Sequence, residues 1–310
     1  MQNEQDAMIM TKNNDLLLDM TRKPRVLLLG NGLLRLAGGG DWSALLNQLS
    51  GSEKSVNLKG IPYAMKPEAL CGPDVESVQR QAAQVIDNSP VHDLLAELLR
   101  MDFDAILTTN YTYEIETAMT GKPWTEYQRR KTFRALDGNP GVRHNTCICN
   151  LVTRADGRVV PVFHIHGEKW RKHSLVLSYY SYAKAVSKLC DFNRQRANIY
   201  QESQLEGKPL QVQSWLDYFL MGDVYSVGLS MDTSEFDLWW AIERKAREKA
   251  EHGRLHAMMS EKASEHLPQY TLFNALDAEY EVFDVAEGRP GDYEAAYAAI
   301  VARIREEMKA

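Results

Sequence analysis

Disulfide frameworks, membrane spans and signal peptides have no counterpart in this sequence. Its four cysteines among 310 residues lack the dense spacing of a disulfide scaffold, which is typical of proteins in a reducing cytosol. No apolar run approaches the roughly 18 residues that a membrane span needs, and no segment resembles a signal peptide. We therefore expect a cytoplasmic protein that makes no membrane contact.

An excess of positive charge is missing as well. The formal net charge is −6, from 36 Lys and Arg against 42 Asp and Glu. A surface that binds nucleic acid needs clustered Lys and Arg to neutralise phosphates. The basic runs at 129–131 and 169–173 are short, and such runs are typical of solvated faces. No direct nucleic-acid binding is therefore predicted.

Short apolar runs alternate with helical patterns along most of the chain. Apolar runs closed by glycine or small polar residues are typical of strands buried on both faces of a parallel sheet. The alternation predicts an α/β fold, a Rossmann-like, doubly wound and mostly parallel sheet with a helical insertion. The predicted strands are 25–30, 105–108, 160–167, 175–178, 223–230, 256–260 and 280–285.

The domain organisation follows from the same patterns. Residues 1–22 are polar and rich in Asn, and we predict a loose arm or a short helix there. Residues 23–310 are predicted to form a single domain. Helical or irregular insertions are expected at about 51–100 and 121–160, where turn residues interrupt the alternation. Asp41 and Ser234 are predicted N-caps of the helices that follow them.

The stretch "RVLLLGNGLLRLAGGGDW", residues 25–42, places five glycines within eleven residues after a predicted strand. Such a loop suggests a phosphate site at a helix start. The dinucleotide fingerprint G-x-G-x-x-G, however, requires glycine where this chain has Arg35. The acidic residue expected about twenty positions further on is also missing, because residues 50–52 lie in a predicted loop. A Rossmann dehydrogenase is therefore disfavoured.

Polar residues gather where the predicted strands end. In an open α/β sheet, ligands bind beyond the carboxyl ends of the strands. Each residue also has a structural alternative: Asn110 suits the N-cap of a helix starting at Tyr111, and His166 suits a histidine packed before a turn. Three strand ends that carry glycine, an amide and an imidazole in one α/β fold are harder to attribute to turns alone. The residues concerned are Gly30, Asn31, Gly32, Thr108, Thr109, Asn110, His164, His166, Gly167, Gly228 and Ser230.

The ordered set "GNG", "TTNY", "HIHG" and "GLS", together with "AGGGDWSALL", resembles a sirtuin-like (SIR2-like) domain of the bacterial type found in antiphage defence. The resemblance covers about 26–240, and the ordered set is more specific than any one motif. It implies cleavage of the nicotinamide–ribose bond of NAD, with NAD as substrate and no metal. The expected activity is an NAD+ glycohydrolase that depletes NAD.

The resemblance also implies residue roles. Asn110 would hold the ribose hydroxyls or the attacking water, and His166 would be the general base, since an unperturbed imidazole exchanges a proton near neutral pH. His164, two residues from His166 and so on the same face of a strand, would support the site or merely pack. NAD binding would fall to Gly30, Asn31, Gly32, Thr109, Gly228 and Ser230, with the last two at the adenosine ribose.

Two alternatives remain open within this resemblance. A protein deacylase needs a structural zinc module of two C-x-x-C-type pairs, and Cys147-x-Cys149 is too tightly spaced for one. A catalytically impaired nucleotide sensor or assembly scaffold is favoured by departures from the family pattern. Leu34 stands where a serine is usual, Thr112 where an aspartate is usual, and Asn31 where an alanine is usual. Because Asn110 and His166 match the pattern, the hydrolase is preferred.

Control by partners is implied by the resemblance alone. An activity that depletes NAD is toxic, so a quiet state before activation is expected. The domains that this chain resembles are controlled by assembly into a homo-oligomer, or by a companion ATPase or other defence-system protein. We expect partners of this kind here.

Overall fold

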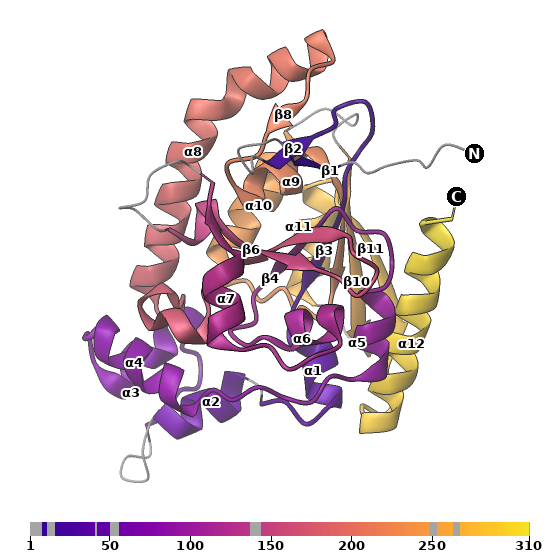
Figure 1. Cartoon of the computed structure of the whole chain (residues 1–310). Coiled ribbons are helices and arrows are strands. Elements are labelled where there is room, and N and C mark those ends of the chain that lie inside the picture. The colour runs from indigo at the N-terminus through magenta and orange to yellow at the C-terminus, as the bar shows by residue number, and fades with distance from the viewer. Residues whose placement is uncertain are drawn as a thin grey trace.

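The structure is a computed structural model that describes residues 8–10, 16–40, 42–49, 56–136, 144–247, 253–262 and 267–309. The predicted N-cap Asp41 lies outside the described residues. A large sheet forms the centre of the molecule (Figure 1). In spatial order its described strands are β11 (Glu279–Asp284), β10 (Leu255–Glu261), β9 (Asp223–Val227), β3 (Arg25–Leu29), β4 (Ala105–Thr108), β7 (Val159–His164), β6 (Ile148–Thr153) and β5 (Phe133–Ala135).

The strand order reverses at β3. The chain moves outward from β3 through β4 to β7, and later returns to β9 on the other side of β3 before continuing to β10 and β11. All strands from β11 to β7 run parallel, whereas β6 and β5 are antiparallel additions at one edge. This is the doubly wound order, and its switch point lies between β3 and β9. The predicted fold class is confirmed.

Helices cover both faces of the sheet, and this explains why the sequence of β3 is apolar without alternation. Its Val26 and Leu28 pack in one core cluster with α9 (Trp215–Met221) and α10 (Phe236–Ala246). Its Leu27 and Leu29 pack in another with α1 (Gly32–Leu36), α5 (Asp93–Leu98) and α12 (Pro290–Glu307). Figure 1 shows α12 and α8 on opposite sides of the sheet. None of the described helices is long and apolar enough to cross a bilayer. The α-helices are α1 (Gly32–Leu36), α2 (Trp42–Leu49), α3 (Lys66–Cys71), α4 (Val75–Val85), α5 (Asp93–Leu98), α6 (Glu114–Thr120), α7 (Glu126–Thr132), α8 (Tyr179–Glu206), α9 (Trp215–Met221), α10 (Phe236–Ala246), α11 (Pro268–Ala275) and α12 (Pro290–Glu307), and the 3-10 helices are Tyr63–Met65, Asn145–Cys147 and Lys169–Ser174.

The four central parallel strands end in register. Val227, Leu29, Thr108 and His164 are neighbours across β9, β3, β4 and β7, in that order. Each strand pair adds one more backbone hydrogen bond beyond these residues. The loops after the four strands therefore start at the same level, which brings the polar residues that follow them to one edge of the sheet.

The N-terminal region differs from the expected loose arm or short helix. Strands β1 (Met8–Met10) and β2 (Leu16–Leu18) pair antiparallel, and β2 also pairs with β8 (Leu210–Gln211) in a small second sheet. Leu16 and Leu18 are buried in the core cluster of α9 and α10. Apolar burial against the domain therefore fixes this segment, despite its polar flanks.

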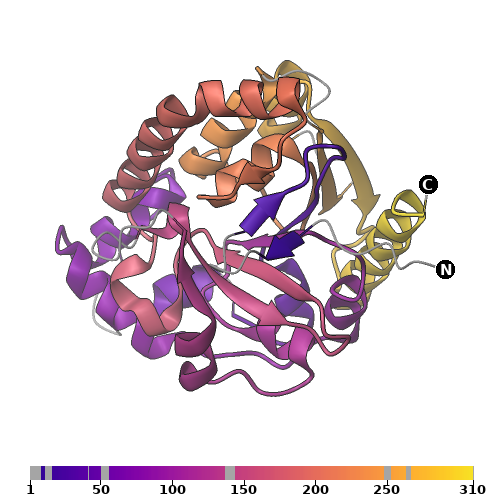
Figure 2. The ribbon, with the colours of Figure 1, turned by 45° about the horizontal axis from the view of Figure 1, so that its top comes forward.

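Three further expectations change. The segment 121–160 is not only an insertion, because β5 and β6 extend the main sheet (Figure 2). Residues 175–178 form no strand and instead lead into α8, the long helix that contacts α10. Ser234 does not cap α10: its hydroxyl donates to Asp232 at 2.5 Å, and Glu235 is the N-cap residue.

A substitution in the glycine loop tests the contact between the loops after β3 and β9. A Cβ on Gly30 would lie 2.3 Å from the backbone oxygen of Gly228, which cannot move aside without shifting the loop. We expect Gly30→Ala to lower the free energy of unfolding by roughly 1–3 kcal/mol, measured by urea denaturation. Gly40→Ala is the matched control, since its Cβ would meet only Ala44 at 3.9 Å. Equal stabilities of the two variants would contradict this packing.

Candidate functional site

The two glycine loops at the switch point contact each other directly. Gly30 N–H donates to Val227 O at 2.9 Å, and Gly32 N–H donates to Gly228 O at 3.0 Å. A Cβ on Gly32 would also collide with the hydroxyl of Tyr297 from α12. Gly228 itself has a φ of +71°, which favours glycine. The close approach of the two loops thus explains why glycine stands at these positions. The backbone amides of Gly30 and Gly32 already have hydrogen-bond partners.

Asn110 connects the end of β4 to the glycine loop. Its side-chain Nδ2 donates to Gly30 O at 3.0 Å, and its backbone N–H donates to Thr108 Oγ1 at 3.0 Å. The residue is buried. Helix α6 starts only at Glu114, with Tyr113 as N-cap residue, so the alternative that Asn110 caps a helix at Tyr111 is wrong. The Asn110 amide therefore bonds to the loop after β3 and does not cap the helix.

His164 is bound on both ring nitrogens by groups that accept hydrogen bonds. Nδ1 lies 2.8 Å from Asn110 O, and Nε2 lies 2.8 Å from Glu116 Oε1. Both acceptors are satisfied when both nitrogens donate, which makes the ring an imidazolium. Burial opposes the charge, but the Glu116 carboxylate outweighs it and raises the pKa of His164 to about 9. His164 holds the backbone of Asn110 in place.

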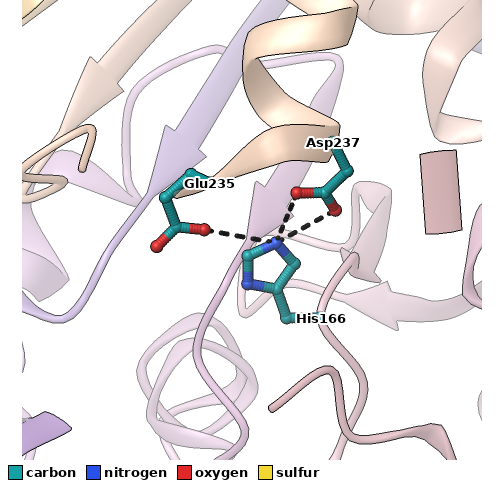
Figure 3. Close-up of side chains that lie close together, drawn as sticks. All are labelled: His166, Glu235 and Asp237. Carbon is teal, nitrogen blue, oxygen red and sulfur yellow. Dashed lines mark hydrogen bonds and ion pairs between the residues drawn. The ribbon is translucent and has the colours of Figure 1, made fainter. Parts of the chain in front are cut away.

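His166 contacts two carboxylates (Figure 3). Its Nε2 lies 3.2 and 3.1 Å from the two carboxylate oxygens of Asp237 and 3.6 Å from Glu235 Oε2. Tyr182 packs edge-on against the imidazole, and its hydroxyl donates to Glu235 Oε2 at 3.0 Å. His166 and Asp237 are buried, whereas Glu235 is partly exposed. The three ligand-type side chains converge on one point.

The protonation of His166 differs from the sequence-based expectation. Burial opposes the charged ring, but Asp237 and Glu235 outweigh it and raise the pKa of His166 to about 9. Burial also raises the pKa of Glu235. The argument from an unperturbed imidazole is therefore wrong, because the ring is protonated at neutral pH. No hydrogen bond joins Nδ1 to a described residue.

Contrary to the sequence-based prediction, His164 and His166 do not lie on the same face of a strand. His164 is the last residue of β7 and meets Glu116 of α6, whereas His166 follows in a turn and meets Asp237 of α10. Helices α6 and α10 belong to opposite faces of the sheet. The alternation of side chains applies only within a strand, and β7 ends before His166.

The remaining residues of the predicted site lie at the same edge with fewer specific contacts. Thr109 N–H donates to Leu29 O at 3.1 Å, and Asn31 precedes α1 without a side-chain capping bond. Ser230 is exposed, and its backbone oxygen accepts from Gln269. Leu34, where the resemblance to sirtuin-like domains would expect a serine, is buried in the core cluster of α1, α5 and α12.

An ion-pair network fixes the turn after β7. Glu168 accepts from Arg129 Nη2 at 2.5 Å and Nε at 3.1 Å, and from the Tyr113 hydroxyl at 3.1 Å. Burial opposes the charge, but the Arg129 hydrogen bonds outweigh it and lower the pKa of Glu168 to about 2. This network ties α6 and α7 to the segment that carries His166.

Sequence reasoning missed Glu116, Glu235 and Asp237. All three lie at or near the first turn of a helix that follows a central strand, which is where a helix N-terminus favours a carboxylate. The segments "YTYEIE" and "SEFD" carried that signal. The cysteines form no group of three metal-ligating side chains within the described residues, where the group found is His166, Glu235 and Asp237.

No protein-family model matches the chain, and a comparison with curated proteins finds no match.

The buried pair of His164 and Glu116 gives a stability prediction. Glu116→Gln would leave a buried imidazolium without its carboxylate, and we expect a loss of roughly 3 kcal/mol in the free energy of unfolding, measured by urea denaturation. Glu126→Gln removes the exposed partner of Arg130 and is the matched control, with an expected change within about 0.5 kcal/mol. A small effect of Glu116→Gln would contradict an ion pair between His164 and Glu116.

Proposed function

We propose that this protein is an NAD+ glycohydrolase. The observation that carries the proposal is the register of the central strands. Thr108 and His164 are paired neighbours of β4 and β7, so Asn110 and His166 each follow by two residues at the same edge. That edge is the carboxyl end of the sheet beside the switch point, where ligands of doubly wound folds bind. The resemblance to sirtuin-like domains assigns the chemistry to these two residues.

The reaction adds water to C1′ of the nicotinamide ribose and releases nicotinamide, ADP-ribose and a proton. Its transition state is oxocarbenium-like, so a site that stabilises it needs polar groups around the ribose. With Nδ2 of Asn110 donating to Gly30, its Oδ1 is left to accept from a ribose hydroxyl or the attacking water. The amide is thereby held in one orientation.

His166 would take the proton at Nδ1. Asp237 binds Nε2–H, as the carboxylate does in a His–Asp pair, and stabilises the imidazolium that forms when Nδ1 accepts a proton. The ring must first lose the proton that it carries at neutral pH. The nicotinamide ring of NAD+ is cationic, and a cation beside an imidazolium favours that loss.

A nucleotide sensor or assembly scaffold is the second candidate. The observation that favours it is that the amides of Gly30 and Gly32 already donate to Val227 and Gly228, so they are not directed at a pyrophosphate. Leu34 also presents no hydroxyl to a ligand. Such a protein would bind NAD or a related nucleotide without releasing nicotinamide.

The biological role we propose is NAD depletion in the cytoplasm during antiphage defence, under the control of a homo-oligomer, a companion ATPase or another defence-system protein. This part rests on the resemblance alone. It predicts little turnover in the isolated chain before activation.

Purified protein incubated with NAD tests the proposal. We expect nicotinamide and ADP-ribose to be released slowly by the isolated chain and faster after activation, as measured by chromatography. In Asn110→Ala and His166→Ala this release should fall at least about 100-fold. The controls Asn274→Ala and His173→Ala change exposed residues of the same types and should retain activity. Circular dichroism and thermal unfolding establish that each variant is folded.

The assay is repeated with lysate from phage-infected cells and with candidate partner proteins. Turnover that survives His166→Ala would contradict the assigned roles. Binding of NAD by calorimetry, with no nicotinamide released under any of these conditions, would favour the sensor over the hydrolase.

A further inference from the structure

His166, Glu235 and Asp237 are also residues of types that bind metal ions. One ligand-type atom of each residue lies within 4.8 Å of the others. Figure 3 shows both carboxylates directed from the start of α10 toward the same ring nitrogen. The imidazole comes from the turn after β7, so the three atoms are supplied by two elements of the fold.

The cluster has less positive charge than its two carboxylates call for, although Leu238 N–H donates to Asp237 Oδ1 at 3.0 Å and the Tyr182 hydroxyl donates to Glu235 Oε2. Nε2 of His166 carries at most one hydrogen, yet three carboxylate oxygens of Asp237 and Glu235 lie within 3.6 Å of it. One imidazolium also balances only one of the two carboxylates. The N-terminus of α10 and the Tyr182 hydroxyl offset part of the remaining negative charge. A divalent cation would meet all three ligand groups at once.

The two distances from His166 Nε2 suit a transition metal. Nitrogen and oxygen ligands lie about 2.0–2.1 Å from Zn2+ in tetrahedral geometry, which separates two ligand atoms by about 3.3 Å. His166 Nε2 lies 3.1 Å from Asp237 Oδ2 and 3.6 Å from Glu235 Oε2, on either side of that value. An imidazole in the ligand set favours zinc and its neighbours, whereas Mg2+ and Ca2+ prefer ligand sets of oxygen alone.

We propose that His166, Glu235 and Asp237 bind one divalent transition-metal ion, best matched by Zn2+, with a fourth position open to water. Tyr182 is the outer residue that orients Glu235, through the hydrogen bond to its Oε2. Metal binding does not depend on the proposed hydrolase. Its consequence does: a metal on Nε2 withdraws both His166 and Asp237 from proton transfer, so the ion inhibits hydrolysis of NAD.

Metal binding is measured on the metal-stripped full chain, by competition with a chromophoric zinc chelator. We expect one Zn2+ per chain, with affinity reduced more than about tenfold by His166→Ala and by Asp237→Asn, and about tenfold by Tyr182→Phe. The conservative Asp237→Asn variant covers the case in which His166→Ala fails to fold. His173→Ala is the matched control for an exposed histidine and should bind as the wild type does.

A second readout separates this site from the cysteines. Cys190 is exposed, so the same titration is made in Cys190→Ser, where affinity should be unchanged. Co2+ substitution should give d–d absorption bands without a thiolate charge-transfer band. Absence of stoichiometric binding, equal binding by Asp237→Asn and wild type, loss of binding in Cys190→Ser, or displacement of Zn2+ by equimolar Mg2+ would each overturn the proposal.

The consequence for hydrolysis is tested separately. Where the wild type releases nicotinamide, one equivalent of Zn2+ should lower that release at least about tenfold, and a chelator should restore it. Binding in the competition assay without any NAD hydrolysis would overturn the proposed function and leave the metal site standing. Hydrolysis that bound Zn2+ leaves unchanged would overturn the inhibition.

Discussion

The structure depends on the register of four parallel strands. Because Val227, Leu29, Thr108 and His164 are neighbours in the sheet, the segments that follow them begin at one level. Residues separated by more than fifty positions thereby share hydrogen bonds, as Asn110 does with the carbonyl of Gly30. A shift of one residue in any of these strands would exchange the side chains on its two faces and displace the polar residues that follow it. The site therefore inherits its geometry from the burial of the core.

Two buried histidines connect that edge to opposite layers of helices. His164 reaches Glu116 of α6, and His166 reaches Asp237 of α10. In each case a carboxylate near a helix N-terminus stabilises an imidazolium that burial alone would neutralise. The arrangement makes the chemistry of the edge sensitive to how both helix layers sit on the sheet.

Most of the fold, but less of the candidate site, could be predicted from the sequence. The strands 25–29, 105–108 and 223–227 were predictable because apolar runs closed by small residues are typical of strands that a doubly wound sheet buries on both faces. The apolar run at 175–178 was misleading, since four apolar or small residues also suit a buried loop. Glu235 and Asp237 escaped notice because a carboxylate in a first helical turn is ordinary until the tertiary structure places an imidazole beside it.

The glycine loop illustrates how one pattern serves two purposes. In the sequence, Gly30 and Gly32 suggest a backbone that a phosphate can approach closely. In the structure, the backbone that approaches is that of Gly228, and the amide hydrogens of the two glycines are taken by the carbonyls of Val227 and Gly228. Glycine is required wherever two main chains meet this closely, whether or not a ligand follows. The chemical character of this edge is therefore better read from Asn110, His166 and Asp237, whose polar groups burial would penalise unless partners were built for them.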